Sequence, residues 1–336
     1  MRESFVIAGE TISPGGRQTV YIPVGRLYDH TDMDMAVHVV HGRNDGPRLF
    51  VSAAIHGDEI NGVEIIRQLL KRRGLGRIRG TLLAVPVVNS FGLITQSRYL
   101  PDRRDLNRSF PGRENGSLAA RLAYVFSEEI VSRSTHGIDL HTGSNHRANL
   151  PQLRAALDDE ETRRLAIAFG APVILDTSAR DGSLREAVVD SGIPMLLYEA
   201  GEALRFDEVA IKAGLRGVLN VMRAIGMLPP LKRRTRPFEP TVARKSGWVR
   251  APKSGLLRAK VRLGDTVTKG AIAAHVVDPI GADDTPVPVP ASGIVIGLLR
   301  NPLVHRGDAL MHIARFDDLE EVEDSIGAFQ DEYVDE

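Results

Sequence analysis

The apolar residues of this chain recur with two different periods, and each period predicts a different kind of element. Alternation over residues 18–24 and 35–40 predicts two half-exposed strands at a sheet edge, and the nearly continuous apolar run 49–55 predicts an interior strand. Apolar positions at helical spacing follow over 58–73, and 82–88 is predicted as another buried strand. A strand, a helix and a second strand in this order favour a parallel pair of strands.

The alternation of strands and helices continues as far as residue 225. Helices are predicted over 118–132, 159–169, 183–190 and 207–225, and strands over 138–141, 173–175 and 195–199. We therefore expect an α/β fold over residues 1–228, with a mixed, largely parallel sheet and helices on both of its faces.

The pattern changes after this α/β region. Two prolines and the basic run 232–237 predict a linker over residues 229–240. Beyond the linker the helical period is absent, and short strands alternate with glycine turns. Residues 254–257 and 292–295 have similar sequences, a weak internal repeat. We expect a small all-β domain over 241–316, a barrel or sandwich built from two similar hairpin units.

The β-rich region is similar to biotinyl and lipoyl carrier domains, whose fold is a pair of swapped hairpins. Those domains carry their prosthetic group on a lysine at an exposed hairpin tip. Here residues 278–290, which lie between the two repeated segments, are rich in proline and aspartate instead. A structural or oligomerising role is therefore the prediction for this region. The acidic residues 317–336 predict an exposed tail that is partly helical.

Composition and charge exclude several classes of protein. The chain has 336 residues, more than one hydrophobic core usually serves, which agrees with two domains. Its 43 basic and 43 acidic residues give no net charge, so we expect neither a nucleic acid nor a membrane as partner. The chain has no cysteine, so any metal must be bound by nitrogen and oxygen. The first residues lack the apolar stretch of a signal peptide, and we expect a cytoplasmic protein.

Two histidines and a glutamate lie where predicted strands end. His56 and Glu59 follow the strand over 49–55, and His141 ends the strand over 138–141; open α/β sheets bind ligands at the carboxyl ends of their strands. His56 and Glu59, three residues apart, can converge on one ion, and zinc in hydrolases usually takes a third protein ligand. Taken singly, each has a plain structural explanation: Glu59 as a carboxylate at a helix N-terminus, and His141 as a packed residue at a strand end.

A polar loop and a further strand end add candidates. The loop 98–112 contains Arg98, Asn107 and Arg108, and an arginine fork suits a carboxylate, although a solvated surface loop has the same composition. A later apolar strand ends in Glu199. A charged residue that closes so apolar a strand needs a partner or a function.

Taken as a set, these motifs resemble the succinylglutamate desuccinylase/aspartoacylase family, relatives of the zinc carboxypeptidases. The resemblance covers about residues 50–201 and rests on the order His-Gly-Asp-Glu, Arg, Asp-Leu-Asn-Arg, Asp-Leu-His-Thr and Glu-Ala-Gly. It implies a zinc carboxypeptidase-like fold and one zinc ion per chain, bound by His56, Glu59 and His141, with Asp105 orienting His56.

The resemblance also implies the roles of the other candidates. Glu199 would be the general base, and Arg98 would face the oxyanion that develops on the substrate. Asn107 and Arg108 would hold the carboxylate of the substrate. Arg185, near the start of a predicted helix, would match a second substrate-binding arginine.

These roles predict a metal-dependent hydrolase that acts on a linear amide C–N bond. The expected activity is removal of a short acyl group, acetyl or succinyl, from an N-acylated amino acid, and acetylated diamino acids are a candidate substrate that the resemblance suggests. The alternatives are a zinc carboxypeptidase or amidase acting on a peptide or peptidoglycan fragment, and a metal-binding or ligand-sensing protein without catalysis. We expect a small-molecule substrate and a homo-oligomer. Chain order adds the hypothesis that the β-rich domain lies over the mouth of the pocket.

Overall fold

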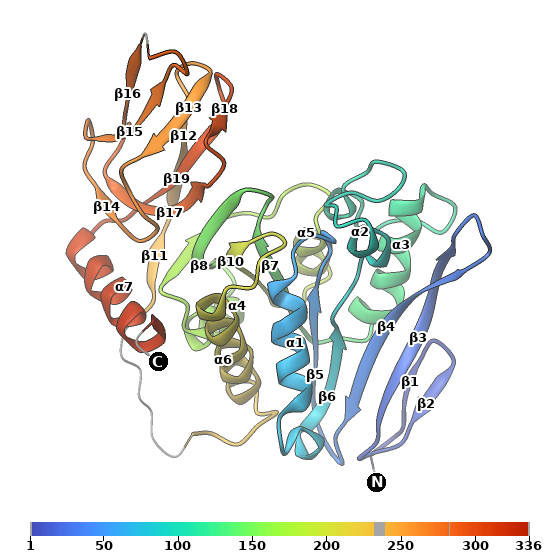
Figure 1. Ribbon diagram of the computed structural model, residues 1–336. Coiled ribbons are helices and arrows are strands. Elements are labelled where there is room, and N and C mark those ends of the chain that lie inside the picture. Colours follow the sequence, from blue (N-terminus) through green and yellow to red (C-terminus); the bar gives the residue numbers. More distant parts are fainter. Residues whose placement is uncertain (1, 232–238, 282, 335–336) are drawn as a thin grey trace.

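A computed structural model describes residues 2–231, 239–281 and 283–334 (Figure 1). Its centre is a mixed sheet, which confirms the α/β fold. The neighbouring strands across this sheet are β3 (Arg17–Arg26), β4 (Asp32–His41), β6 (Arg79–Val85), β5 (Asn44–Ala53), β7 (His136–Gly143), β10 (Met195–Glu202) and β8 (Arg147–Ala155). The strands from β6 to β10 are parallel, whereas the β3–β4, β4–β6 and β10–β8 pairs are antiparallel.

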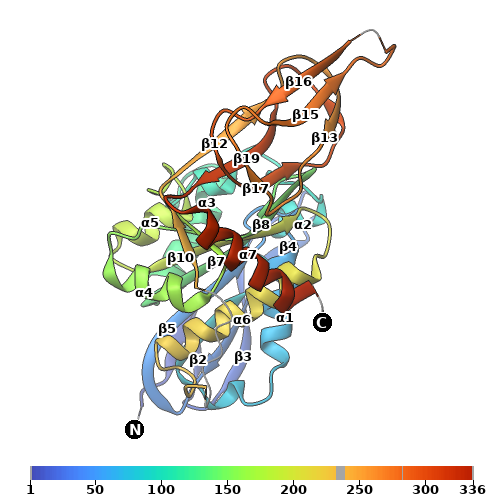
Figure 2. The ribbon, with the colours of Figure 1, turned by 90° about the vertical axis from the view of Figure 1, so that its left-hand side faces the viewer.

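Helices cover both faces of the central sheet, as the sequence predicts (Figures 1 and 2). One layer contains α1 (Asn61–Lys71), α4 (Glu160–Phe169) and α6 (Glu208–Ala224), and the other contains α2 (Ser90–Ile94), α3 (Leu118–Phe126) and α5 (Leu184–Asp190). Side chains of β5 alternate between the two layers: Leu49 and Val51 pack with the first, and Phe50 packs with the second. The helix predicted over 118–132 is α3 followed by a π-helical turn, Ser127–Val131.

Strand β8 is an element that the sequence pattern does not predict. Its apolar residues are interrupted by Arg147, Asn149, Gln152 and Arg154, and Pro151 lies in the middle. Polar and apolar residues alternate over 147–150 and again over 152–155, but the alternation changes phase at Pro151, so no single strand period runs through the segment. The strand nevertheless lies inside the sheet, between β10 and β17 (Gly293–Leu299), and it also pairs with β9 (Val173–Asp176).

The C-terminal strands form two sheets packed against each other. The first contains β12 (Lys245–Arg250), β19 (Ala309–Arg315), β17 and the short β14 (Thr266–Val267), and the second contains β16 (Asp284–Pro288), β15 (Ile272–Val277), β13 (Gly255–Ala259) and β18 (Leu303–Val304). Apolar side chains of both sheets, such as Val249, Leu257 and Val276, share one core. The arrangement is the sandwich that the glycine-turn pattern predicts.

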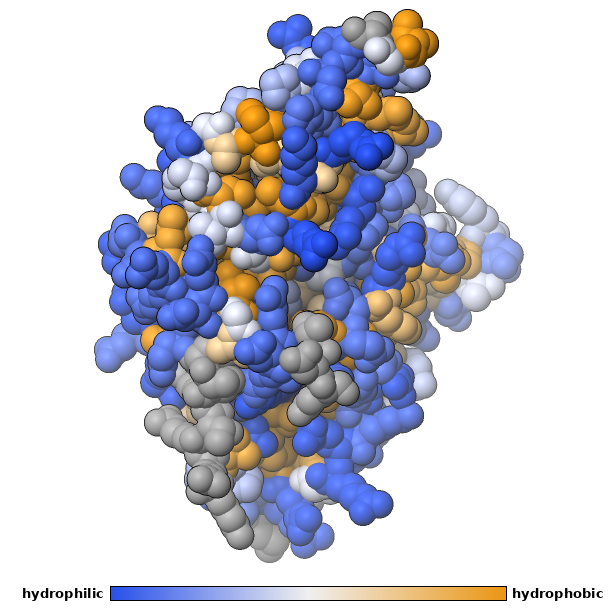
Figure 3. Space-filling model, turned by 60° about the vertical axis from the view of Figure 1, so that its left-hand side comes forward, coloured by the Kyte–Doolittle hydropathy of each residue, from blue (hydrophilic) through white to orange (hydrophobic). Residues whose placement is uncertain are grey.

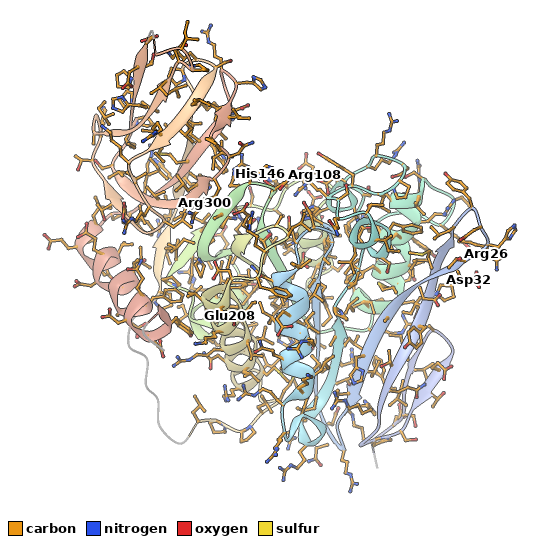
Figure 4. The ribbon with its side chains drawn as sticks, in the orientation of Figure 1. Arg26, Asp32, Arg108, His146, Glu208 and Arg300 are labelled. Carbon is orange, nitrogen blue, oxygen red and sulfur yellow. The ribbon has the colours of Figure 1, made fainter. Side chains whose placement is uncertain are left out.

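The C-terminal sandwich is joined to the central sheet by strand pairing. Strand β17 pairs with β8, with Gly297 opposite Asn149, and β11 (Thr241–Ala243) pairs with β9. The backbone N–H of Arg300 also donates to the carbonyl oxygen of His146, at 2.7 Å; Figure 4 shows these two residues close together, with Arg108 farther along the same upper edge of the central sheet. The central sheet therefore continues into the C-terminal region.

The acidic C-terminal segment is a packed helix, not an exposed tail. Residues Leu319–Val334 form α7, and its side chains Val322, Ile326, Phe329 and Tyr333 expose 1%, 3%, 1% and 8% of their surface. The expectation of an exposed tail was wrong because apolar residues recur at helical spacing among the acidic ones. The helix packs against α6 and β11.

Two further expectations concern the linker and membranes. The basic run 232–237 of the expected linker lies outside the described residues. No helix in the described part of the chain is long and apolar enough to cross a membrane. Figure 3 shows a largely hydrophilic surface, on which apolar side chains gather mainly over the C-terminal strands.

Candidate metal centre and active site

His56, Glu59 and His141 form a buried cluster at the carboxyl ends of β5 and β7. Their possible ligand atoms lie within 4.8 Å of one another. Nδ1 of His56 lies 2.7 Å from Oε1 of Glu59, and Nδ1 of His141 lies 2.8 Å from Oε2 of the same carboxylate. Because β5 and β7 are adjacent parallel strands, their ends meet at one edge of the sheet. The structure thus brings together the three residues that the sequence singled out.

A second carboxylate contacts each histidine on its far side. Nε2 of His56 lies 3.1 Å from Oδ1 of Asp105, and Nε2 of His141 lies 2.6 Å from Oδ2 of Asp139. The other oxygen of Asp139 accepts a hydrogen bond from the Ser52 hydroxyl at 2.8 Å. Each imidazole therefore faces a carboxylate through both of its nitrogens, although a neutral imidazole has only one N–H.

This arrangement fits a divalent metal ion. When Nε2–H of each histidine donates to its outer carboxylate, the Nδ1 lone pairs point at the cluster and are free to bind a cation. Nη1 of Arg98 lies 3.2 Å from Nδ1 of His56 and is a second possible partner for that atom. Two histidines and one glutamate that leave a position for water are a donor set typical of catalytic zinc. The residues present therefore fit zinc.

The electrostatics of the cluster agree with a bound cation. Burial opposes protonation of both histidines, but Glu59 and Asp105 raise the pKa of His56, and Asp139 and Glu59 raise that of His141 well above its usual value. Burial also disfavours ionised Glu59, yet the two histidines outweigh it and lower the pKa of that carboxyl. The site is thus set up to hold positive charge between its ligand atoms.

Close backbone packing positions the turn that carries His56 and Glu59. A Cβ atom on Gly57 would lie 1.9 Å from the carbonyl carbon of Gly92, so only glycine fits between the two metal ligands. Just before the turn, Ala54 has a φ of 51°, a left-handed conformation that costs energy for alanine. The surrounding structure therefore holds this turn in one conformation.

Arg98 lies beside the cluster and pairs with Asp105. Its Nη2 and Nε lie 2.9 and 3.2 Å from Oδ2 of Asp105, and its Nη1 lies 3.4 Å from Oε1 of Glu59. Asp105 also accepts the backbone N–H of Asn107 at 2.9 Å through the oxygen that contacts His56. One carboxylate thus joins the loop, the arginine and the histidine, which agrees with the orienting position expected for Asp105.

The three residues expected to bind substrate all line the same cavity, but two are engaged by the protein. Oδ1 of Asn107 accepts the backbone N–H that begins α5, at 2.9 Å. Arg185 donates to the carbonyl oxygens of Thr177 and Ser178, at 3.0 and 2.6 Å, and would have to exchange these bonds to contact a ligand. Within the described part of the chain, Arg108 donates to the neighbouring carbonyl of Asn107 alone.

Glu199 lies on β10, opposite His141 of the neighbouring strand. Its carboxylate accepts hydrogen bonds from Nε of Arg154 at 2.9 Å and from Nδ2 of Asn149 at 2.5 Å. Both partners come from β8, which the sequence pattern does not show, and so neither was predicted. The sequence had indicated only that a charged residue closing an apolar strand needs a partner or a function.

The C-terminal strands contribute one wall of the cavity, with Ser246, Trp248 and His312 among its lining residues. The rings of Trp248 and His312 stack at 4.3 Å with an angle of 9° between them, and the Arg147 guanidinium lies 4.7 Å from the Trp248 ring centre. None of these residues was predicted. The sole sequence signal is that Trp248 is the single tryptophan of the chain.

The cluster, Arg98, Glu199 and the wall residues line one cavity of about 730 Å³. A family model described as the succinylglutamate desuccinylase/aspartoacylase catalytic domain matches residues 45–225, which hold the cluster, Arg98 and Glu199. The chain belongs to this family. The family resemblance drawn from the motifs is thereby confirmed.

Several proteins are similar to this chain over most of its length. The N-alpha-acetyl-L-2,4-diaminobutyric acid deacetylase of Halomonas elongata is 29% identical over 302 residues, 85% of each protein. A solved succinylglutamate desuccinylase/aspartoacylase from Rhodobacter sphaeroides has a TM-score of 0.81 at 24% identity, over 94% of this chain and 97% of its own. The product-bound ectoine utilization protein EutE (DoeB) from Ruegeria pomeroyi has a TM-score of 0.80 at 22% identity, over 93% and 95%. The shared fold therefore includes the C-terminal strands.

Proposed function

We propose that this protein is a zinc-dependent deacylase that removes a short acyl group, acetyl or succinyl, from an N-acylated amino acid. The observation that carries the proposal is the buried cluster of His56, Glu59 and His141 in one cavity with Glu199. Family membership and the deacetylase relative support hydrolysis of an N-acyl amide. The donor set supports zinc as the metal.

In this proposal each residue around the metal has a separate role in amide hydrolysis. A zinc ion held by His56, Glu59 and His141 would supply Lewis acidity at the acyl carbonyl and would lower the pKa of water towards ~7. Glu199 takes a proton from the attacking water and returns it to the leaving nitrogen. Arg98 donates to the carbonyl oxygen as negative charge develops there, and loss of one such donor typically costs about 2.7–4 kcal/mol.

The partners of Glu199 keep it ready for this proton transfer. Arg154 and Asn149 each bind one of its two oxygens, so the carboxylate cannot rotate freely. A general base must lie within hydrogen-bond reach of its proton, and a fixed carboxylate meets this requirement without reordering.

The cavity favours a small substrate. Its volume of about 730 Å³ lies within the range typical of small-molecule sites, and Trp248 and His312 line one side of it. Asn107 and Arg108 line this cavity, and in the proposal they bind the carboxylate of the amino acid, Arg108 with its guanidinium and Asn107 with its amide N–H. An extended peptide would need a longer groove. The expected homo-oligomer and the expected cytoplasmic location stay predictions.

The test is release of free amine from a panel of N-acetyl and N-succinyl amino acids by wild-type protein and Glu199→Gln. The variant should lose at least about a hundredfold in kcat, because general acid–base catalysis typically contributes that much, and should keep its zinc content. Glu208→Gln, at the exposed start of α6, is the matched control and should retain activity. Full activity of Glu199→Gln, or turnover of peptides but not of the panel, would overturn the proposal.

A further inference from the structure

The backbone of β10 is irregular directly after Glu199. Against β7, Glu199 lies opposite His141 and Glu202 lies opposite Gly143, so β10 contains one residue more than β7 over this stretch. Against β8, the register also shifts between Glu199 and Gly201. Bulges next to active sites re-aim the side chains beside them. The direction of the Glu199 side chain therefore depends on how this irregular backbone is held.

The side chain of Asn61 holds both ends of the segment that follows Glu199. Asn61 is the first residue of α1, and it exposes 1% of its surface. Its Nδ2 donates to the carbonyl oxygen of Ala200 in a long hydrogen bond of 3.4 Å, and its Oδ1 accepts the backbone N–H of Asp207 at 3.1 Å. Asp207 precedes α6, which lies beside α1 on the same face of the sheet (Figure 1). One buried amide thus joins the segment 200–207 to α1.

Gly201, the last residue of the Glu-Ala-Gly motif, packs directly against this amide. Its φ is 74°, in the left-handed region, and a Cβ atom on it would lie 2.4 Å from Nδ2 of Asn61. Glycine is therefore needed at this position both for the backbone conformation and for the close approach of the amide. The motif provides a carboxylate and, two residues later, the space in which Asn61 reaches the bulge.

A backbone hydrogen bond also attaches the same segment to the turn that carries Glu59. The N–H of Leu204 donates to the carbonyl oxygen of Asp58 at 2.8 Å. Leu204 has a φ of 58°, a conformation that costs energy for leucine and persists only where the surrounding structure holds it. The segment 200–207 is therefore held by residues on both sides of Glu59, namely Asp58 and Asn61.

We propose that Asn61 is a positioning residue, which fixes the Glu-Ala-Gly backbone against the turn of the metal cluster and so sets the place of the Glu199 carboxylate relative to the metal. The inference rests on the proposed function, in which Glu199 is the general base. Arg154 and Asn149 bind the carboxylate itself, whereas Asn61 acts on the backbone that carries it.

The expected size of the effect follows from the geometry of catalysis. A misplacement of about 1 Å at a reacting group can reduce the rate about a hundredfold. Asn61 is not among the described residues that line the cavity, so its removal takes no contact from the substrate. Its loss should therefore lower kcat and leave KM nearly unchanged.

The first experiment measures kcat, KM and zinc content of Asn61→Ala with the N-acyl amino acid that wild type cleaves best. We expect kcat to fall about ten- to a hundredfold, with KM within about threefold of wild type and the zinc content unchanged. Asn220→Ala is the matched control, because Nδ2 of Asn220 on α6 also donates to a backbone carbonyl oxygen, that of Phe169, at 3.4 Å, and it should keep the wild-type kcat. A wild-type kcat in Asn61→Ala would overturn the inference, and so would a loss of zinc from the folded variant.

The second experiment separates positioning of Glu199 from a general structural effect. Asn61→Ala is combined with Glu199→Gln, and the residual kcat of the pair is compared with that of Glu199→Gln alone. If Asn61 acts through Glu199, its removal should change this residual kcat by less than about threefold. A further fall of about tenfold or more would show that Asn61 acts on other parts of the site, and it would overturn the inference.

Gly201→Ala perturbs the same contact from its other partner. The added Cβ would displace the Asn61 amide, so we expect the same pattern of a lowered kcat with little change in KM or zinc content. Thermal unfolding temperatures show which variants are folded. Gly201→Ala decides the inference if Asn61→Ala does not fold, and a wild-type kcat in it would count against the inference.

Crystal structures of zinc-loaded wild type and Asn61→Ala test the inference without any activity measurement. The Glu199 carboxylate should move by about 1 Å or more relative to the zinc, while His56, Glu59 and His141 stay in place. If wild type cleaves no N-acyl amino acid, or if Glu199→Gln keeps full activity, the proposed function fails, and this comparison alone decides the inference. An unmoved carboxylate would overturn it.

Discussion

Acidification should destabilise this protein through His312, an uncharged histidine enclosed by cations. The side chain exposes 5% of its surface, stacks on Trp248, and lies near Arg154, Arg147 and Arg180. Burial, followed by repulsion from the three arginines, lowers its pKa from 6.5 to about 3. Protonation of His312 in the folded protein is therefore unfavourable.

The sign and size of the effect follow from proton linkage. Between pH 6.5 and 3 the unfolded chain binds a proton at this histidine and the folded protein does not, so stability falls as the pH falls. Each pH unit in that window costs up to about 1.4 kcal/mol. From pH 7 to pH 5, His312 should therefore reduce the free energy of unfolding by about 2 kcal/mol.

The assay is urea unfolding of zinc-loaded wild-type protein and His312→Gln at pH 7 and pH 5. Glutamine keeps a planar polar side chain but does not titrate, so the variant should lose about 2 kcal/mol less than wild type between the two pH values. Other titrating groups, the metal ligands included, are common to both proteins and cancel in the difference. His305→Gln, on an exposed turn, is the control and should lose as much as wild type. Equal losses in wild type and His312→Gln would refute the reasoning.

Three further substitutions test the metal centre and the C-terminal helix. Asp139→Asn weakens the orienting bond to His141 and should lower zinc affinity by about 10- to 100-fold in competition with a chelator; unchanged affinity would contradict that role. Gly57→Ala forces its Cβ against Gly92 and should reduce both zinc content and thermal stability, and wild-type values of both would count against this packing. Phe329→Ala removes a side chain that is 1% exposed and should cost about 3–5 kcal/mol of unfolding free energy; a loss below 1 kcal/mol would show that α7 is not docked.

The metal cluster could be predicted because short local patterns in the sequence place its residues at the ends of strands. His56 follows an apolar strand and His141 lies near the carboxyl end of another, and parallel neighbouring strands bring such residues to one sheet edge. Glu199 could be singled out in the same way, as a charged end to an apolar strand. Glu199 is distant from the other site residues along the chain, but its strand is parallel and adjacent to the strand of His141, which brings the two residues side by side.

The rest of the site could not be predicted because it depends on contacts between distant segments. Arg147, Asn149 and Arg154 reach the cavity only because β8 inserts between β10 and β17. The alternation of polar and apolar residues in β8 changes phase at Pro151, which interrupts the strand period in its sequence. Trp248 and His312 belong to the cavity only because β17 extends the central sheet from β8, and no local pattern encodes that pairing.

Helix α7 shows a different reason for a wrong prediction. Val322, Ile326, Phe329 and Tyr333 recur at helical spacing, which is visible in the sequence. The acidic composition of the segment suggested a solvated tail, but a helix can expose its acidic face and bury the apolar one. In this segment the helical spacing of the apolar residues indicated the structure better than the acidic composition did.

The central claim is that His56, Glu59 and His141 hold a catalytic zinc ion. The most direct test removes metal from the purified protein with a chelator, adds zinc back in steps, and measures both bound zinc and release of free amine from an N-acyl amino acid. Activity should disappear on chelation and rise in proportion to bound zinc, reaching its limit at about one zinc per chain, and Glu59→Gln should neither bind zinc at this stoichiometry nor recover. Deacylation that persists without metal, or full recovery in Glu59→Gln, would contradict the account.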